Sequence, residues 1–273
     1  MRVQEIRRYP VKSCRGESVG AALLEPWGLA GDRRWMLVDD DGKALTARNH
    51  PRLLLVTPRW AADGGLDVAG PDARSLHVAL PAGPPSEVRV SRTPVFATSA
   101  DGRSNEWFSN YLGLRCRLFY LDNAAQRRVD PAFAEPEDRV SLADAYPLLL
   151  TSTASLAALS AWAGEPLSMT RFRPNLVVDG APPWAEDGWR RLRIGSATLR
   201  AVKGCDRCVM TTIDPETAVT GHEPLRTLAK YRRWDGKTWF GMNLVPDVSG
   251  VQIAVGDTVE VLTAVAAPDG PPR

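Results

Sequence analysis

Two thiols and a cation lie within four residues at Cys205-Asp206-Arg207-Cys208, the segment of this chain best suited to chemistry. Thiolates are soft ligands for soft or redox-active metals. An adjacent arginine favours the deprotonated thiol and also suits a phosphate or a carboxylate. The segment therefore predicts a metal site or a redox site.

On the residues alone, several interpretations of this pair stay open. A structural zinc site or an iron–sulfur cluster needs about four ligands, yet the chain has only three histidines, and its other cysteines, Cys14 and Cys116, are far away in sequence. A thioredoxin-type pair normally opens a helix, whereas the β-branched run 209–213 predicts a strand. A purely structural pair is a further interpretation. The last is a single thiolate on a metal whose other ligands come from a cofactor.

The elements around this pair are expected to be mostly strands. Short apolar or alternating runs predict strands at residues 34–38, 53–56, 76–80, 115–121, 175–178, 197–202 and 258–262. Residues 39–42 predict a hairpin turn. Helices are expected from a cap at Ser104 to Gly113, from Ser152–Ser155 to Gly164, and from about Glu223 to Tyr231. The pattern predicts an α+β protein that is mainly β and barrel-like, because closure removes exposed strand edges.

A polar segment at 123–138 with two prolines predicts a division into residues 1–122 and 123–265. The last ten residues, 264–273, are rich in Ala, Pro and Gly and are expected to fray.

The net charge of +2 among 273 residues, with no basic block, argues against nucleic-acid binding. No apolar run approaches about 18 residues, so no membrane span is expected. The N-terminus does not resemble a secretory signal, and a cytoplasmic location with reduced thiols is expected.

An ordered set of motifs resembles the MOSC family with its N-terminal β-barrel domain. The N-terminal motifs are Tyr9-Pro10-Val11-Lys12-Ser13-Cys14, Gly31-Asp32-Arg33-Arg34-Trp35 and Leu45-Thr46-Ala47-Arg48. The later motifs are Arg171-Phe172-Arg173-Pro174-Asn175, the cysteine pair with Thr211-Thr212 and Asp214-Pro215, Glu223-Pro224-Leu225, and Phe240-Gly241 with Asn243. The resemblance covers about residues 1–262. It implies an N-terminal β-barrel-like domain packed on a MOSC β-barrel domain with a few short helices.

The resemblance also implies a molybdenum cofactor, a pterin dithiolene with a phosphate tail, as the bound group. Mapped by motif, Cys208 supplies the thiolate to molybdenum and is the expected catalytic and metal-binding residue. The expected cofactor contacts are Lys12, Ser13, Arg33, Arg173, Asn175, Asp206, Arg207 and Asn243. Arginine forks suit phosphate oxygens, and asparagine amides suit the mixed polar edge of a pterin.

Taken one at a time, these residues have plainer interpretations. Lys12 and Arg33 fit solvated strand positions, and Arg173 fits an ion pair with Asp179. Asn175 fits a turn after Pro174. Asp32 fits a turn role after Gly31 better than a catalytic one.

The implied function is a molybdenum-dependent reductase of N-hydroxylated compounds such as amidoximes and hydroxylamines. Some members carry a C-terminal [2Fe–2S] domain, and no plant-type cysteine run of that kind is present here. A separate electron donor is therefore expected, of the ferredoxin, flavodoxin or cytochrome b5 type. The alternatives are a cofactor carrier or sulfur-transfer module without turnover, and a plain thiol redox protein.

Overall fold

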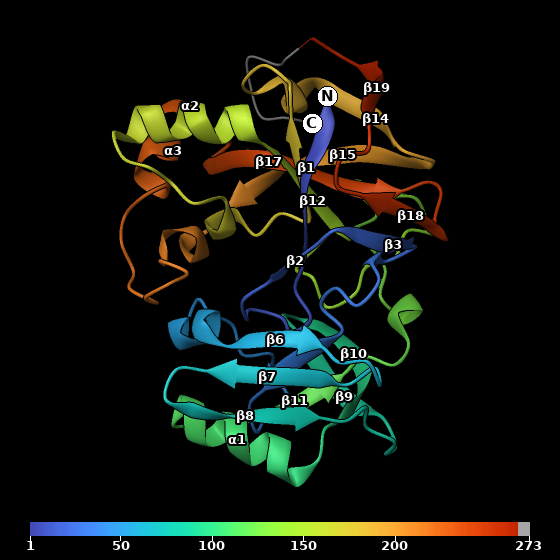
Figure 1. Cartoon of the computed structure of the whole chain (residues 1–273), viewed down its shortest axis with the longest axis vertical. Coiled ribbons are helices and arrows are strands. Elements are labelled where there is room, and N and C mark those ends of the chain that lie inside the picture. Colours follow the sequence, from blue (N-terminus) through green and yellow to red (C-terminus); the bar gives the residue numbers. More distant parts are fainter. Residues whose placement is uncertain (267–273) are drawn as a thin grey trace.

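The computed structural model describes residues 1–266, which form an upper and a lower body in the view of Figure 1. The upper body is built on nine strands: β1 (Arg2–Arg8), β2 (Glu17–Val19), β12 (Leu148–Ser152), β13 (Leu176–Asp179), β14 (Trp189–Ile194), β15 (Ala197–Arg207), β16 (Arg233–Trp234), β17 (Lys237–Pro246) and β19 (Val259–Ala264). They form one sheet in the order β19-β14-β15-β17-β12-β13-β1-β2, with β16 beside β17. Only β12 and β13 run parallel among the paired strands of this sheet.

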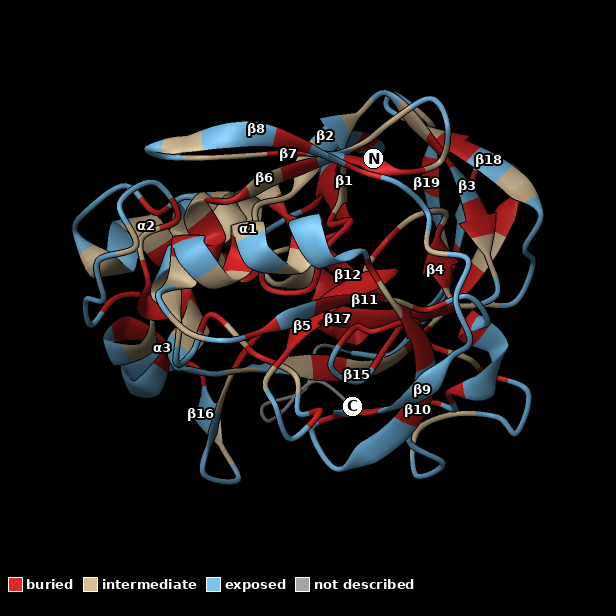
Figure 2. Cartoon of the chain, turned by 90° about the horizontal axis from the view of Figure 1, so that it is seen from below, coloured by how far each residue is buried: buried red, intermediate tan, exposed pale blue. Residues whose placement is uncertain are grey.

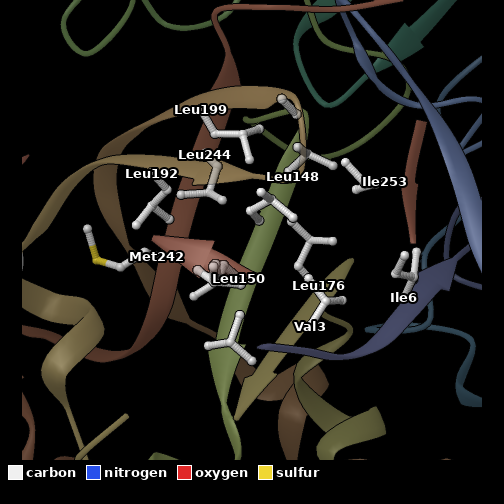
Figure 3. Close-up of a cluster of buried hydrophobic side chains, with 14 of the residues drawn as sticks. Val3, Ile6, Leu148, Leu150, Leu176, Leu192, Leu199, Met242, Leu244 and Ile253 are labelled. Atoms are coloured by element: carbon white, nitrogen blue, oxygen red, sulfur yellow. The ribbon is translucent and has the colours of Figure 1, made fainter. Parts of the chain in front are cut away.

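Alternating side chains explain which face of this sheet is buried. In β14, Leu192 and Ile194 are fully buried, whereas Arg193 between them is exposed, as the two-residue period of a strand requires. Leu148, Leu150 and Leu244 from β12 and β17 join them in one apolar core (Figure 3). Each fully buried side chain of this kind contributes about 1.5–3 kcal/mol to folding.

The lower body contains two smaller sheets and one helix. One sheet has the order β5 (Trp35–Val38), β11 (Arg117–Tyr120), β10 (Thr93–Ser99) and β9 (Ser86–Val90). The other pairs β6 (Thr57–Trp60), β7 (Leu66–Gly70) and β8 (Ala73–Val78). Helix α1 (Gly102–Leu112) packs on β11 and β8 and exposes its outer face (Figure 2).

The first strands of the chain pair with strands from its C-terminal half. Strand β1 pairs antiparallel with β13, so Arg2 lies opposite Asp179 and Ile6 opposite Leu176. Strands β3 (Ala21–Glu25) and β4 (Gly28–Leu29) form a third small sheet with β18 (Val251–Ala254). The division at residues 122 and 123 stays a prediction, and strands from both sides of it share sheets.

The expectation of a mainly β protein with three helices is confirmed. Helix α2 (Thr153–Ala163) begins after the cap Ser152 and ends at Gly164, as predicted. Helix α3 (Leu225–Tyr231) lies within the predicted range. For α1 the predicted end at Gly113 is correct, but the cap is Asp101, whose carboxylate accepts from the Ser104 amide. The turn at 39–42 is also present, with Val38 bridged to Ala44.

Two predicted strands are 3-10 turns instead. Residues 53–56 fall largely in η1 (Pro51–Leu55), because Pro51 starts a turn that still buries Leu53 and Leu54. Residues 209–213 fall largely in η5 (Val209–Thr212). There the hydroxyl groups of Thr211 and Thr212 donate to the carbonyls three residues earlier, which favours a turn over a ladder.

The other 3-10 turns are η2 (Ala124–Gln126), η3 (Met169–Phe172) and η4 (Ala185–Gly188). The predicted frayed end, 264–273, lies outside the described residues from 267 onward. Within residues 1–266, no helix has the length and apolar character needed to cross a membrane.

Candidate functional site

A cavity of about 350 Å³ lies where the two bodies meet, and the cysteine pair opens into it. It collects side chains from the N-terminal segment, from the loop before β12, from η3, and from β15, η5 and β17. All nine residues that the sequence predicted for the site line this cavity: Lys12, Ser13, Arg33, Arg173, Asn175, Asp206, Arg207, Cys208 and Asn243. The cavity thus brings together residues from both halves of the chain.

Cys208 is the more accessible of the two thiols. It is exposed and unpaired, and it sits at the N-terminal end of η5, directly after β15. The Nε of Arg48 lies 3.3 Å from its Sγ and donates a hydrogen bond to it. An accessible sulfur beside a cation is well placed to act as a thiolate ligand or nucleophile.

Cys205 lies in a different environment. Its thiol is half-buried and accepts a hydrogen bond of 2.8 Å from Arg207 Nη1. Burial raises the pKa of Cys205, and the nearby Arg207 guanidinium opposes that rise. Arg207 also donates to the Phe172 carbonyl at 2.7 Å, which fixes the guanidinium against η3. The two cysteines are therefore not equivalent.

Asp144 joins two cations from the N-terminal part of the chain. Its Oδ1 accepts from Lys12 Nζ, and its Oδ2 accepts from Arg48 Nη2 at 2.5 Å. Lys12 and then Arg48 hold the pKa of Asp144 well below its usual range. Burial lowers the pKa of Lys12, and the Asp144 carboxylate opposes that shift. The result is a chain of contacts from Lys12 through Asp144 and Arg48 to Cys208.

Tyr9 contacts two further arginines of the cavity. The guanidinium carbons of Arg33 and Arg173 each lie 4.2 Å from the centroid of its ring. Both arginines adopt positive φ, 46° and 56°. Burial lowers the pKa of Arg173 to about 10, so this group remains a cation at neutral pH. Arg173 donates to the Cys14 carbonyl at 2.6 Å and not to Asp179.

Asn175 connects the Arg33 side chain to the upper sheet. Its Oδ1 accepts from Arg33 at 3.1 Å and from the Leu149 amide at 3.2 Å, and its Nδ2 donates to the Arg7 carbonyl. Asp32 is buried and accepts from the Tyr9 amide and from Arg33, in keeping with the turn role. Both side chains therefore order the wall of the cavity.

Ser13 and Asn243 present polar atoms that the protein does not use. Among residues 1–266 the Ser13 hydroxyl has no hydrogen-bond partner, although the residue is buried. The amide of Asn243 donates to the Gly204 carbonyl at 3.2 Å, which leaves its oxygen free to accept. Arg207 Nε is also buried without a partner in the same part of the chain. Such atoms suit a polar ligand in the cavity.

The cavity is cationic although the protein is nearly neutral. Seven lysine and arginine side chains line it against three aspartates, Asp130, Asp144 and Asp206. Asp144 is paired with Lys12 and Arg48, and Asp206 lies 3.2 Å from Lys237. Arg33 and Arg171 are paired with carboxylates outside the lining. The remaining positive charge, on Arg173, Lys203 and Arg207, favours an anionic ligand.

Sequence reasoning missed several lining residues. Arg48 stood inside a quoted motif, and its position beside the other motifs was the available signal. Asp144 and Lys203 carried no such signal. Within the described chain all four cysteines are free, and no group of three or more His, Cys, Asp or Glu side chains is arranged to hold a metal ion.

Comparisons with known proteins identify the family. The MOSC N-terminal beta barrel domain matches residues 1–115, and the MOSC domain matches residues 137–260. The chain is 34% identical to human mitochondrial amidoxime-reducing component 1, over 95% of this chain and 82% of that protein. It is 35% identical to human mitochondrial amidoxime reducing component 2, over 83% of this chain and 71% of that protein.

Among solved structures, the YuaD protein from Bacillus subtilis superposes with a TM-score of 0.45 at 12% identity, over 94% of this chain and 93% of that chain. The sequence matches are far stronger than this likeness. They agree with the order of motifs along the chain, from Tyr9 to Asn243. This chain therefore belongs to the MOSC family and combines the MOSC N-terminal beta barrel domain with the MOSC domain.

Proposed function

We propose that this protein binds a molybdenum cofactor and reduces N-hydroxylated compounds. The observation that carries the proposal is the exposed Cys208 thiol in a cationic cavity that all nine predicted site residues line. The names of the relatives, amidoxime-reducing components, support the same reaction class.

The chemistry of the lining suits such a cofactor. An anionic group with a phosphate needs fixed cationic donors, and a pterin edge needs groups that both donate and accept. Arg207 Nε, the Ser13 hydroxyl and the Asn243 oxygen have unused hydrogen-bonding capacity within residues 1–266. Cys208 is the one cysteine of that range that is exposed, and its sulfur is a soft ligand.

We assign the roles as follows. Cys208 would bind the metal, and Lys12, Arg33, Arg173 and Arg207 would supply positive charge for the anionic parts. Ser13, Asn175, Asp206 and Asn243 would complete the polar contacts, with Asn175 acting chiefly by holding Arg33. The exposure of Cys208 leaves the site open to water, which would deliver protons.

The proposed reaction consumes two electrons and two protons. The N–O bond of an amidoxime breaks, the nitrogen gains one proton to give an amidine, and the hydroxyl group takes the other proton and leaves as water. The cofactor, when bound, supplies the two-electron redox chemistry. A separate protein of the ferredoxin, flavodoxin or cytochrome b5 type would return the electrons. The cytoplasmic location also stays a prediction.

The test begins with protein produced in a host that makes the cofactor. We expect molybdenum and pterin to co-purify with the protein in equal amounts, and reduced viologen to drive conversion of benzamidoxime to benzamidine. Tight cofactor binding without turnover would instead support a carrier or sulfur-transfer module. Activity without molybdenum that needs both Cys205 and Cys208 would support a thiol redox protein.

A further inference from the structure

A second cavity, of about 530 Å³, adjoins the first and has no role in the function proposed so far. It is formed mainly by the segment from η5 to the start of α3, together with Glu165 after α2 and Arg171 of η3. The residues that line it are Glu165, Arg171, Thr212, Asp214, Thr217, Val219, Gly221, His222, Glu223 and Arg226.

The two cavities share a wall close to Cys208. Arg171 lines both of them, and its Nη2 donates to Asp214 Oδ2 at 2.7 Å on the side of the second cavity. Turn η5 follows Cys208 directly, and its neighbouring residues Thr211 and Thr212 line the first and second cavity respectively. The second cavity therefore lies beside the Cys208 site, across Arg171.

Most charges in the second cavity neutralise one another. Arg171 pairs with Asp214, and Arg226 pairs with Glu223 through a contact of 2.6 Å. Glu165 is the remaining carboxylate, and it is exposed, with no hydrogen bond or ion pair to any other described residue. With His222 counted as neutral, the three carboxylates of this cavity outnumber its two arginines by one, in contrast to the cationic first cavity.

One large hydrophobic side chain, that of Val219, lines the same cavity. Val219 is 65% exposed, the most exposed of the large hydrophobic side chains in the described chain. Its main chain is held by hydrogen bonds with Asp214 and with the Thr217 hydroxyl. A ligand with an apolar body and a positive end would match Val219 and Glu165 together.

We propose that the second cavity binds the part of the substrate remote from its N–O bond and favours substrates with a positive charge there. This inference rests on the proposed reductase function. A cavity the size of the first holds one small ligand, so the cofactor would fill much of it. The body of the substrate then needs the adjoining space. The preferred substrates are N-hydroxylated compounds with an apolar linker and a distal cation.

The test compares three substrates of one shape with the cofactor-loaded protein. They are benzamidoxime, its 4-aminomethyl derivative, which is cationic at the distal end, and its 4-carboxy derivative, which is anionic. An exposed charge pair gives a modest effect, so we expect KM for the cationic compound to be about two- to fivefold below that of benzamidoxime. KM for the anionic compound should be higher than that of benzamidoxime.

Two variants locate the effect. Glu165→Gln should remove the advantage of the cationic compound and raise its KM to about that of benzamidoxime. Val219→Lys should reverse the order and favour the anionic compound. Glu87→Gln, an exposed glutamate on β9, is the matched control and should behave as the unmodified protein.

Equilibrium binding separates this inference from the proposed function. The dissociation constant of the non-reducible 4-(aminomethyl)benzamidine is measured with each protein. Glu165→Gln should raise this constant by about the same factor as it raises KM for the cationic substrate. If benzamidoxime is not reduced at all, the proposed function fails, while the binding measurement still tests the cavity. Equal KM values for the three substrates, or binding that is unaffected by both variants, would overturn the inference.

Discussion

Arg48 Nε lies 3.3 Å from Cys208 Sγ and donates a hydrogen bond to it across the boundary between the two bodies. The same guanidinium binds Asp144, which in turn binds Lys12. One arginine from the N-terminal part of the chain therefore holds the sulfur that we propose as the metal ligand. Residues that orient a ligand affect metal affinity although they do not touch the metal.

We expect Arg48→Met to weaken the retention of molybdenum. The lost charged hydrogen bond is worth about 1 kcal/mol, because Arg48 is 36% exposed, and this corresponds to a roughly fivefold change. The molybdenum-to-protein ratio after dialysis measures the loss, and the Mo(V) electron paramagnetic resonance signal reports the changed sulfur environment. Arg48→Lys should restore part of both. Unchanged retention and an unchanged signal in Arg48→Met would show that the contact is dispensable.

The cysteine pair predicts unequal effects of serine substitution. Cys208→Ser removes the proposed ligand, so molybdenum content and benzamidoxime reduction should fall by more than the roughly tenfold typical of losing a residue that only supports a ligand. Cys205→Ser keeps an acceptor for Arg207 Nη1 and should be milder. Metal analysis and initial rates compare the two. Equal losses in both variants would contradict a single-ligand role for Cys208.

Much of the fold could be predicted from local sequence patterns. The two segments that were wrongly predicted as strands show what such patterns do not capture. The run from Val209 to Ile213 has the β-branched composition of a strand. The Thr211 and Thr212 hydroxyls nevertheless bond to carbonyls three residues back and turn the chain. Side-chain bonds to the main chain of this kind compete with ladder formation, and composition alone does not reveal them.

The motifs predicted the residues of the site, but they did not predict which side chains those residues contact. Lys12 and Cys208 were predicted one by one, and both line the same cavity. The bond between Arg48 and Asp144 joins residues 96 positions apart, and no periodicity or spacing encodes it. The second cavity depends in the same way on how the segment after Cys208 folds against η3.

Tyr9 should be needed to keep Arg33 and Arg173 in place. Tyr9→Phe loses only the hydrogen bond to the Pro174 carbonyl, so the free energy of unfolding should fall by about 1 kcal/mol. Tyr9→Leu also removes both cation–π contacts and should lower the free energy of unfolding by about 2 kcal/mol more. Urea unfolding measures both values. Similar losses in the two variants would mean that the ring face contributes nothing.

Gly241 should tolerate no side chain. Its φ is +79°, and a Cβ there would lie 2.7 Å from the Leu150 carbonyl oxygen. Gly241→Ala combines backbone strain with a collision in the centre of the sheet, so the free energy of unfolding should fall by about 3 kcal/mol. Gly236 has φ of +72° and open space where a Cβ would lie, and Gly236→Ala should lower the free energy of unfolding by only about 1 kcal/mol. Denaturant midpoints distinguish the two, and equal shifts would exclude the collision.

We expect Glu186 to make the free energy of unfolding depend on pH. It is fully buried in η4, where Ser155 Oγ donates to its Oε2 at 2.8 Å. Its Oε1 has no hydrogen-bond partner within residues 1–266. Burial raises the pKa of Glu186 from 4.5 to about 7, so the folded protein keeps this proton under conditions where the unfolded chain has lost it.

The folded-state pKa lies above the unfolded value, so the stabilising effect of the proton is complete below pH 4.5 and is lost as the pH rises through 7. The free energy of unfolding should therefore contain a component of about 3 kcal/mol that disappears between these limits. Glu186→Gln mimics the protonated acid, so it should remove this component and stabilise the protein at pH 8. Urea unfolding from pH 5 to 8 measures the difference from the unmodified protein, with Glu87→Gln as the exposed control. Parallel pH profiles for Glu186→Gln and the unmodified protein would show that Glu186 is ionised throughout.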